Sequence, residues 1–305
     1  MIRPILFTLA VTGASIARAE VPVVVTDIPV VQSLVAQVMG DLGTPELLVN
    51  AGAEPHSYQL RPSQARALRS ADLIFWVGPE MTPWLERALQ TAPEGSSTIL
   101  LSAPGTMVQP YPEYADVGTA DQDHDDHDHE EDSTDPHAWL DPANGRAWLA
   151  VIRDRLAATD PDNATTYRQN AETADSAIAA LEDELQTTLA AVAGKPLVMG
   201  HNAYGYFAHR FGLTIAATIE AGDAAEPGAA HLSAVTALLA AQKAICLFPE
   251  TGQDSKRAAL LVEGTNTRLG GALDPEGISL PTGLALYGEL MRRLAQTVAD
   301  CVAQG

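Results

Sequence analysis

The stretch that decides the fold is residues 161–193, which read PDNATTYRQNAETADSAIAALEDELQTTLAAVA. It contains no glycine or proline after its start, and four apolar side chains recur along it at helical spacing: Ile178, Leu181, Leu185 and Leu189. At about 1.5 Å per residue, a helix of this length spans a whole domain. We therefore interpret the stretch as a stiff connector between two folded units.

Short apolar runs alternate with helical stretches on both sides of this connector. Nearly continuous apolar runs are typical of parallel strands that are covered on both faces. We expect strands in seven runs: residues 23–26, 46–50, 73–78, 98–101, 196–199, 213–219 and 244–249. We expect helices in stretches between them: residues 30–39, 62–70, 203–211 and 232–242. The alternation predicts two Rossmann-like α/β domains with parallel sheets, joined by a long rigid connecting helix.

This pattern divides the chain into four expected parts. Residues 1–19 are a signal peptide, and residues 20–160 form an N-terminal α/β domain. The connecting helix covers residues 161–193, and residues 194–305 form a C-terminal α/β domain. Inside the N-terminal domain, residues 111–135 are acidic and poor in apolar side chains, which predicts a mobile loop.

The N-terminus has the features of an export signal. Arg3 supplies the positive start, and residues 5–16 form an apolar stretch that is interrupted only by small or weakly polar side chains. The small-x-small cleavage pattern Ala17-Arg18-Ala19 follows. The stretch is too short for a membrane anchor, because a bilayer needs about 20 apolar residues. We expect cleavage after Ala19 and a soluble periplasmic protein.

Charge and cysteine content narrow the function further. The 305 residues carry a formal net charge of −21, which repels nucleic acid and suits a protein that meets cations.

The only two cysteines are Cys246 and Cys301. In an exported chain, two cysteines are more often a disulfide than two free thiols. We predict a bridge that staples the C-terminal domain.

Three histidines and one aspartate occupy comparable positions in the predicted fold. His56 follows the second predicted strand, His137 precedes a helix, and His201 lies at the carboxyl end of a strand. Asp274 follows the last predicted strand. Ligands of open α/β sheets bind outside the carboxyl ends of the strands, so two facing domains can bring these four residues together. The alternative is that each histidine only caps a helix or stabilises a loop.

The chemistry of these four side chains matches zinc. Three imidazoles and one carboxylate form a tetrahedral donor set that suits Zn²⁺, whereas an oxygen-rich set would favour manganese. A second candidate is the acidic segment at residues 121–132, which contains His124, His127 and His129. Mixed histidine and carboxylate tracts bind divalent metals loosely, and the alternative is a solvated charge run.

Several longer motifs carry a resemblance to a known family: GAEPHSYQLRPS at residues 52–63, ADLIFWVGPEM at 71–81, PHAWL at 136–140, HNAYGYF at 201–207, GTNTRLG at 264–270 and LDP at 273–275. Together they resemble the zinc-specific solute-binding proteins of bacterial ABC importers, the ZnuA-like branch of the TroA-like family. The histidine-rich segment before His137 is also similar to that branch. The resemblance implies two α/β domains joined by a long helix, with the metal in the cleft between them.

The resemblance also implies a ligand set. His56, His137 and His201 match the family's ligands, and manganese-type relatives carry an acidic residue at the position of His201. Asp274 matches a fourth position that binds metal in some members and is replaced in others. Glu276 stands where the family often has leucine, so the fourth donor is Asp274, Glu276 or water. Both cysteines match a disulfide of zinc-type members.

The expected function is periplasmic, high-affinity capture of Zn²⁺ and its delivery to an ABC permease with its ATPase. A periplasmic zinc metallochaperone is a further possible partner, and we expect a monomer that is not an enzyme. Three alternatives stay open: a manganese or iron carrier of the same fold, a zinc buffer or sensor, and a zinc-dependent hydrolase. The sequence has no His-Glu-x-x-His motif and no nucleophile elbow, although Glu54 lies two residues from His56 and could act as a base.

Overall fold

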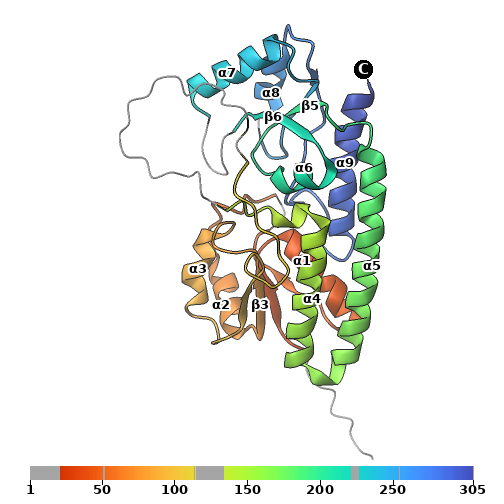
Figure 1. The fold of residues 1–305 in the computed structure, drawn as a ribbon. Helices are drawn as coiled ribbons and strands as arrows, with labels where there is room; N and C mark the ends of the chain where they lie inside the picture. The colour runs from red at the N-terminus through yellow and green to blue at the C-terminus, as the bar shows by residue number, and fades with distance from the viewer. Residues whose placement is uncertain are drawn as a thin grey trace, which may run out of the picture.

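The computed structural model describes residues 21–50, 52–112, 114, 134–220, 227–253 and 255–304. It shows two four-stranded parallel sheets, one in each half of the molecule (Figure 1). The predicted signal peptide and the histidines of the acidic segment lie outside the described residues. The predicted fold class of two parallel-sheet α/β units is confirmed.

The sheet of the N-terminal half has the strand order β2-β1-β3-β4. Its strands are β1 (Val24–Thr26), β2 (Glu46–Leu47), β3 (Leu73–Trp76) and β4 (Ser97–Ile99). Its helices are α1 (Pro29–Met39), α2 (Pro62–Ser70), α3 (Pro83–Leu89) and α4 (Pro142–Thr159). Each helix begins with proline, whose fixed φ suits the first helical position and whose missing N–H is not needed there.

The sheet of the C-terminal half repeats this arrangement with the order β6-β5-β7-β8. Its strands are β5 (Pro196–Met199), β6 (Thr214–Thr218), β7 (Cys246–Phe248) and β8 (Arg268–Leu269). Its helices are α6 (Gly205–Phe211), α7 (Ala229–Ala240), α8 (Ser255–Val262) and α9 (Leu286–Ala303). The seven expected strands coincide with β1 to β7, mostly with shorter bounds, and β8 is an addition.

The two halves share one hydrophobic core. One cluster of buried side chains runs from β1, α1 and α4 through α5 and α9 to β5 and β7. Two smaller clusters cover the opposite faces of the two sheets. Successive residues therefore enter different clusters, as Val24 and Val25 of β1 do, because side chains alternate across a strand.

The predicted connector is helix α5 (Ala164–Leu189), with 26 residues. It is shorter than the expected 161–193, because residues 161–163 form a separate 3-10 turn and residues 190–194 form turns. At 1.5 Å per residue it is about 39 Å long. It packs against α1, α4 and α9, so it is supported by other helices along its length.

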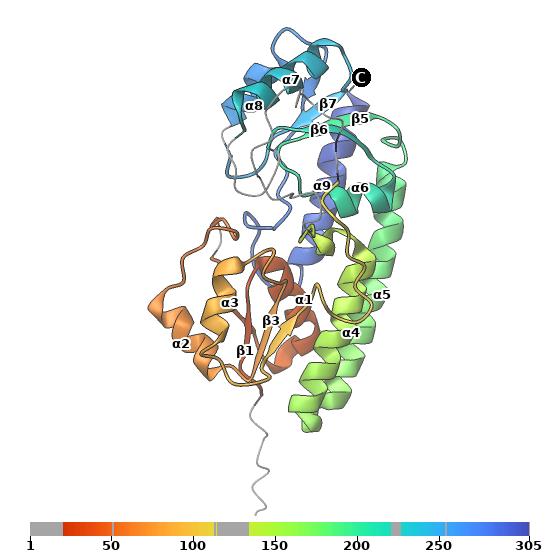
Figure 2. The same cartoon turned by 60° about the vertical axis from the view of Figure 1, so that its left-hand side comes forward.

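Helix α9 lies along the C-terminal half, and its start reaches the N-terminal half (Figures 1 and 2). At its start, the Tyr287 hydroxyl donates a hydrogen bond of 2.9 Å to the carbonyl of Trp139, in the N-terminal half. Near its end, Cys301 forms a disulfide with Cys246 of the inner strand β7. The predicted disulfide is therefore confirmed, and α9 connects the two halves as α5 does.

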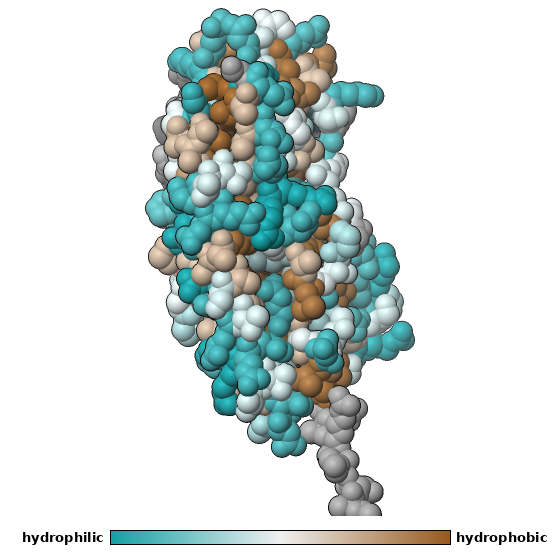
Figure 3. Space-filling model, turned by 90° about the vertical axis from the view of Figure 1, so that its right-hand side faces the viewer, coloured by the Kyte–Doolittle hydropathy of each residue, from teal (hydrophilic) through white to brown (hydrophobic). Residues whose placement is uncertain are grey.

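The surface shows no continuous apolar area on the face that carries α5. That face is mainly hydrophilic, and its hydrophobic side chains form small separate areas (Figure 3). Among the described residues, no helix combines the length and the apolar character that crossing a membrane requires.

Candidate metal centre

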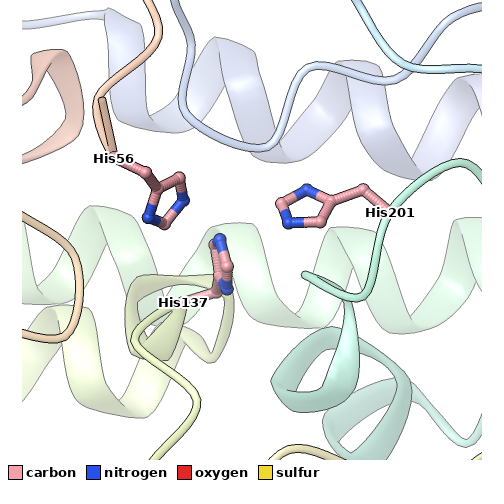
Figure 4. A group of neighbouring side chains, drawn as sticks. All are labelled: His56, His137 and His201. Carbon is pink, nitrogen blue, oxygen red and sulfur yellow. The ribbon is translucent and has the colours of Figure 1, made fainter. Parts of the chain in front are cut away.

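The three predicted histidines meet between the two halves of the molecule. His56 lies in the segment between β2 and α2, His137 directly precedes the 3-10 turn Ala138–Leu140, and His201 follows β5. One ligand nitrogen of each lies within 4.8 Å of the other two. The rings converge on one point, with ring centroids 5.2 to 6.3 Å apart (Figure 4).

This spacing is close to that of a bound ion. Nitrogens at 2.0–2.1 Å from a tetrahedral Zn²⁺ lie about 3.3 Å from one another, so small side-chain movements would complete the site. His137 is fully buried and His201 is 4% exposed, whereas His56 is half-buried. The centre is therefore largely shielded from water, and the side of His56 is its more open side.

A carboxylate holds each of the two buried imidazoles. His137 Nδ1 lies 2.8 Å from Asp135 Oδ1, and His201 Nδ1 lies 3.2 Å from Glu250 Oε1. When Nδ1 donates its proton to a carboxylate, the tautomer is fixed and Nε2 presents its lone pair to a metal. His137 Nε2 is buried and has no hydrogen-bond partner among the described residues, as expected for a ligand atom.

Glu276 brings a further oxygen to the centre. Its Oε1 lies 3.9 Å from His137 Nε2, and the side chain is almost completely buried. Burial raises the pKa of the Glu276 carboxyl well above its usual range, and the nearby Glu250 carboxylate raises it further. A divalent cation would reverse this effect, because a positive charge favours the ionised form.

Asp274, the favoured fourth ligand from the sequence, belongs to neither group of metal-ligating atoms that the described residues form. Its Oδ1 accepts a hydrogen bond of 3.0 Å from the Ile278 amide. Its Oδ2 accepts from the Ser279 amide at 2.9 Å and from the Ser279 hydroxyl at 2.5 Å. Asp274 therefore closes the loop that carries Glu276, and Glu276 is the oxygen donor that the structure presents.

The position of His137 depends on contacts from the other half. The carbonyl of Asp135 accepts a hydrogen bond of 3.0 Å from the hydroxyl of Tyr206, in α6. The same hydroxyl accepts from the Gln109 amide at 2.8 Å, and Pro110 pairs with Thr134 in an isolated antiparallel bridge. These contacts join residues 109–110 to residues 134–135 beside His137.

The His56 loop is anchored by α3. Trp84 Nε1 donates a hydrogen bond of 2.7 Å to the carbonyl of Pro55, the residue before His56. The His56 amide donates to Glu54 Oε1 at 3.1 Å. The carboxylate that could have served as a hydrolytic base therefore lies against the backbone of its own loop.

Two positioning residues, Asp135 and Glu250, were not predicted from the sequence. Glu250 lies two residues after the end of β7, so the rule that selected His201 could also have selected it. Asp135 precedes His137 by two residues in a quoted motif, but nothing in the pattern shows that its side chain turns back to the imidazole. His124, His127 and His129 lie outside the described residues.

The family model "Zinc-uptake complex component A periplasmic", ZnuA, matches residues 24–301. The chain belongs to this family. It is 49% identical to the "High-affinity zinc uptake system protein ZnuA" of Paracoccus denitrificans, over 99% of both chains. It is 33% identical to the protein of the same name from Brucella suis, over 98% of this chain and 96% of the relative.

The fold also has counterparts of known structure. A periplasmic metal binding protein from Candidatus Liberibacter asiaticus superposes with a TM-score of 0.75, over 92% of this chain and 99% of the other. The sequence identity is 23%, so this likeness concerns the fold of the ZnuA-like chain alone.

Proposed function

We propose that this protein captures Zn²⁺ in the periplasm with high affinity and delivers it to the permease of an ABC importer, which is driven by its own ATPase. The observation that carries the proposal is the convergence of His56, His137 and His201 between the two halves. The zinc uptake systems named for its relatives from Paracoccus and Brucella support the choice of cargo.

The donor set favours zinc over manganese and iron at this position. Three imidazole nitrogens suit Zn²⁺, which accepts four ligands in tetrahedral geometry without preference from d electrons. Glu276 supplies the fourth donor in this proposal, with water as the alternative. Asp274 acts indirectly, because its carboxylate accepts hydrogen bonds from the loop that presents Glu276.

The proposal includes export and a role for the acidic segment. Residues 1–19 direct the chain to the periplasm and are removed after Ala19. The segment with His124, His127 and His129 binds Zn²⁺ weakly and gathers it beside His137. Deleting residues 121–132 should leave the tight site intact, remove weaker zinc equivalents and slow loading from a donor such as a metallochaperone. Titration calorimetry and stopped-flow loading measure these three effects.

The central test is the zinc affinity of single histidine variants. Competition with a chromophoric chelator should show one tight site in the wild-type protein. His56→Ala, His137→Ala and His201→Ala should each weaken it by at least a hundredfold, because few ligands remain. The matched control is His209→Ala, which removes an exposed imidazole from α6. An unchanged affinity in His137→Ala would disprove the assignment.

Two other functions are separated by simple assays. A zinc hydrolase should cleave ester or peptide substrates when zinc-loaded, and the proposal expects no turnover. A buffer or sensor would bind zinc without a transporter. We expect the metal-loaded protein, but not His137→Ala, to stimulate ATP hydrolysis by the cognate permease and ATPase in liposomes. Absence of stimulation by the loaded protein would exclude delivery.

A further inference from the structure

A second set of metal-ligating side chains lies beside the three histidines. One ligand atom each of His201, Glu250 and Glu276 lies within 4.8 Å of the other two. All three side chains are buried, and the two glutamates are 8% and 3% exposed. This set shares only His201 with the three-histidine set.

The second set belongs entirely to the C-terminal half. His201 follows β5, Glu250 follows β7, and Glu276 lies seven residues beyond the end of β8. These three strands are neighbours in the order β5-β7-β8. Because parallel strands end at the same edge, the sheet brings His201 and Glu250 together. The loop after β8, closed by Asp274, brings Glu276 to them. The N-terminal half contributes none of them.

The charge of this set calls for a cation. Two carboxylates that are removed from water and close together repel each other when both are ionised. Within the described ranges, no lysine or arginine forms an ion pair with Glu250 or Glu276; the imidazoles of His201 and His137 lie 3.2 and 3.9 Å from them. A divalent cation would neutralise both carboxylates at once.

A ligand nitrogen of the three-histidine set lies beside the second set. His137 Nε2 is fully buried and has no hydrogen-bond partner among the described residues. It lies 3.9 Å from Glu276 Oε1, too far for a direct hydrogen bond. A buried nitrogen without a partner therefore faces the carboxylate that both ion positions can use.

We propose that the protein has a second, oxygen-rich position for a divalent cation, formed by His201, Glu250 and Glu276, and that this position binds a hard ion such as Mn²⁺. One imidazole and two carboxylates suit Mn²⁺, whereas three imidazoles suit Zn²⁺. Both positions need His201, so they hold one ion at a time. Mn²⁺ and Zn²⁺ then compete for His201 and Glu276, while Glu250 takes the place of His56 and His137 in the Mn²⁺ position.

The second position goes beyond zinc delivery. It predicts that zinc affinity and Mn²⁺ affinity can be lowered independently, which a single binding site would not allow. The variant H56A/H137A loses two of the three zinc-binding imidazoles but keeps the whole second set. Its zinc affinity should fall by at least a hundredfold, while its Mn²⁺ affinity stays within threefold of the wild-type value. Adding E276Q to this variant should then lower Mn²⁺ affinity by at least tenfold.

The experiment is a Mn²⁺ titration of the metal-free mature protein at pH 7.5, followed by electron paramagnetic resonance. The matched control is E263Q, which removes an exposed carboxylate from the same half and should leave Mn²⁺ affinity unchanged. Zinc affinity is measured on the same samples, so failure of the three-histidine site is recognised separately. Zn²⁺ should displace all bound Mn²⁺ from the wild-type protein.

A spectroscopic readout on the wild-type protein does not depend on the folding of variants. Pulsed resonance of bound Mn²⁺ should show coupling to one imidazole nitrogen. Coupling to three imidazoles, equal loss of Mn²⁺ and Zn²⁺ binding in H56A/H137A, or no Mn²⁺ binding to the wild-type protein would each overturn the proposal. Retention of Mn²⁺ after zinc loading would also overturn it.

Discussion

Replacing Asp135 by asparagine tests how much of the zinc affinity comes from the orientation of a ligand. Asp135 Oδ1 accepts two hydrogen bonds from His137, one from the amide at 3.0 Å and one from Nδ1 at 2.8 Å. Asp135 and His137 are both fully buried. The substitution keeps the size of the side chain and removes its charge.

The expected loss follows from the tautomer of His137. An asparagine amide can donate to Nδ1 instead of accepting from it, and the proton then moves to Nε2 and blocks the ligand atom. Even where the oxygen faces Nδ1, a charge-assisted hydrogen bond becomes a neutral one. Loss of such a partner lowers metal affinity about 10- to 100-fold, or about 1.4–2.8 kcal/mol.

The assay is chelator competition for Zn²⁺ with Asp135→Asn and its control Asp175→Asn, which removes the charge of a partly exposed pair with Arg146. Thermal unfolding of the metal-free proteins detects any general loss of stability. A zinc affinity of Asp135→Asn within twofold of wild type, with the fold intact, would show that the carboxylate does not orient His137.

Four further predictions concern the same molecule. Glu276→Gln should weaken zinc binding about tenfold, and Asp274→Asn should weaken it less; the reverse order in chelator competition would make Asp274 the ligand. Zinc affinity should fall steeply as the pH decreases from 7.5 to 5.5, because protons compete with the metal ion for the ligand nitrogens, and a flat calorimetric profile over this range would contradict this. Burial raises the pKa of the Asp27 carboxyl in the folded protein from 3.8 to about 7. The stabilisation from protonated Asp27 is therefore complete below pH 3.8, the pKa in the unfolded chain, and is lost as the pH rises through 7. Urea unfolding of the metal-free protein should therefore show about 2–3 kcal/mol less stability at pH 8 than at pH 5 from this group, and Asp27→Asn should lack this slope. Replacing both Cys246 and Cys301 by alanine should lower the free energy of unfolding by up to about 4 kcal/mol in the chain-entropy model, and an unchanged denaturant midpoint would contradict this.

The strands could be predicted because their apolar runs reflect burial on both faces. Residues 73–78 read almost without a polar side chain, and β3 has both neighbours and both faces covered. Strand β8 has only two residues, Arg268 and Leu269, and neither is buried. Its place in the sheet comes from pairing with β7, which leaves no hydrophobic pattern in the sequence.

The sequence predicted which histidines form the candidate metal centre, but it did not predict which carboxylate supplies the oxygen donor. The strand-end rule predicted that two facing domains bring His56, His137 and His201 together, and the structure places them together. The same rule could not decide between Asp274 and Glu276, which are two residues apart. That choice depends on the turn at residues 277–279, whose amides point to Asp274 and occupy its oxygens.

The way the halves are joined limits how the centre can open. A rotation of one half against the other would have to bend or displace both α5 and α9 and disrupt the core that both halves share. The loop that carries His56 is held by the bond from Trp84 to Pro55 and by a 3.0 Å bond from the Gly52 amide to the Ile278 carbonyl. The latter joins the His56 loop to the loop that presents Glu276. Movement of the open side of the centre is therefore linked to its oxygen donor, while His137 and His201 stay fixed by their buried carboxylates.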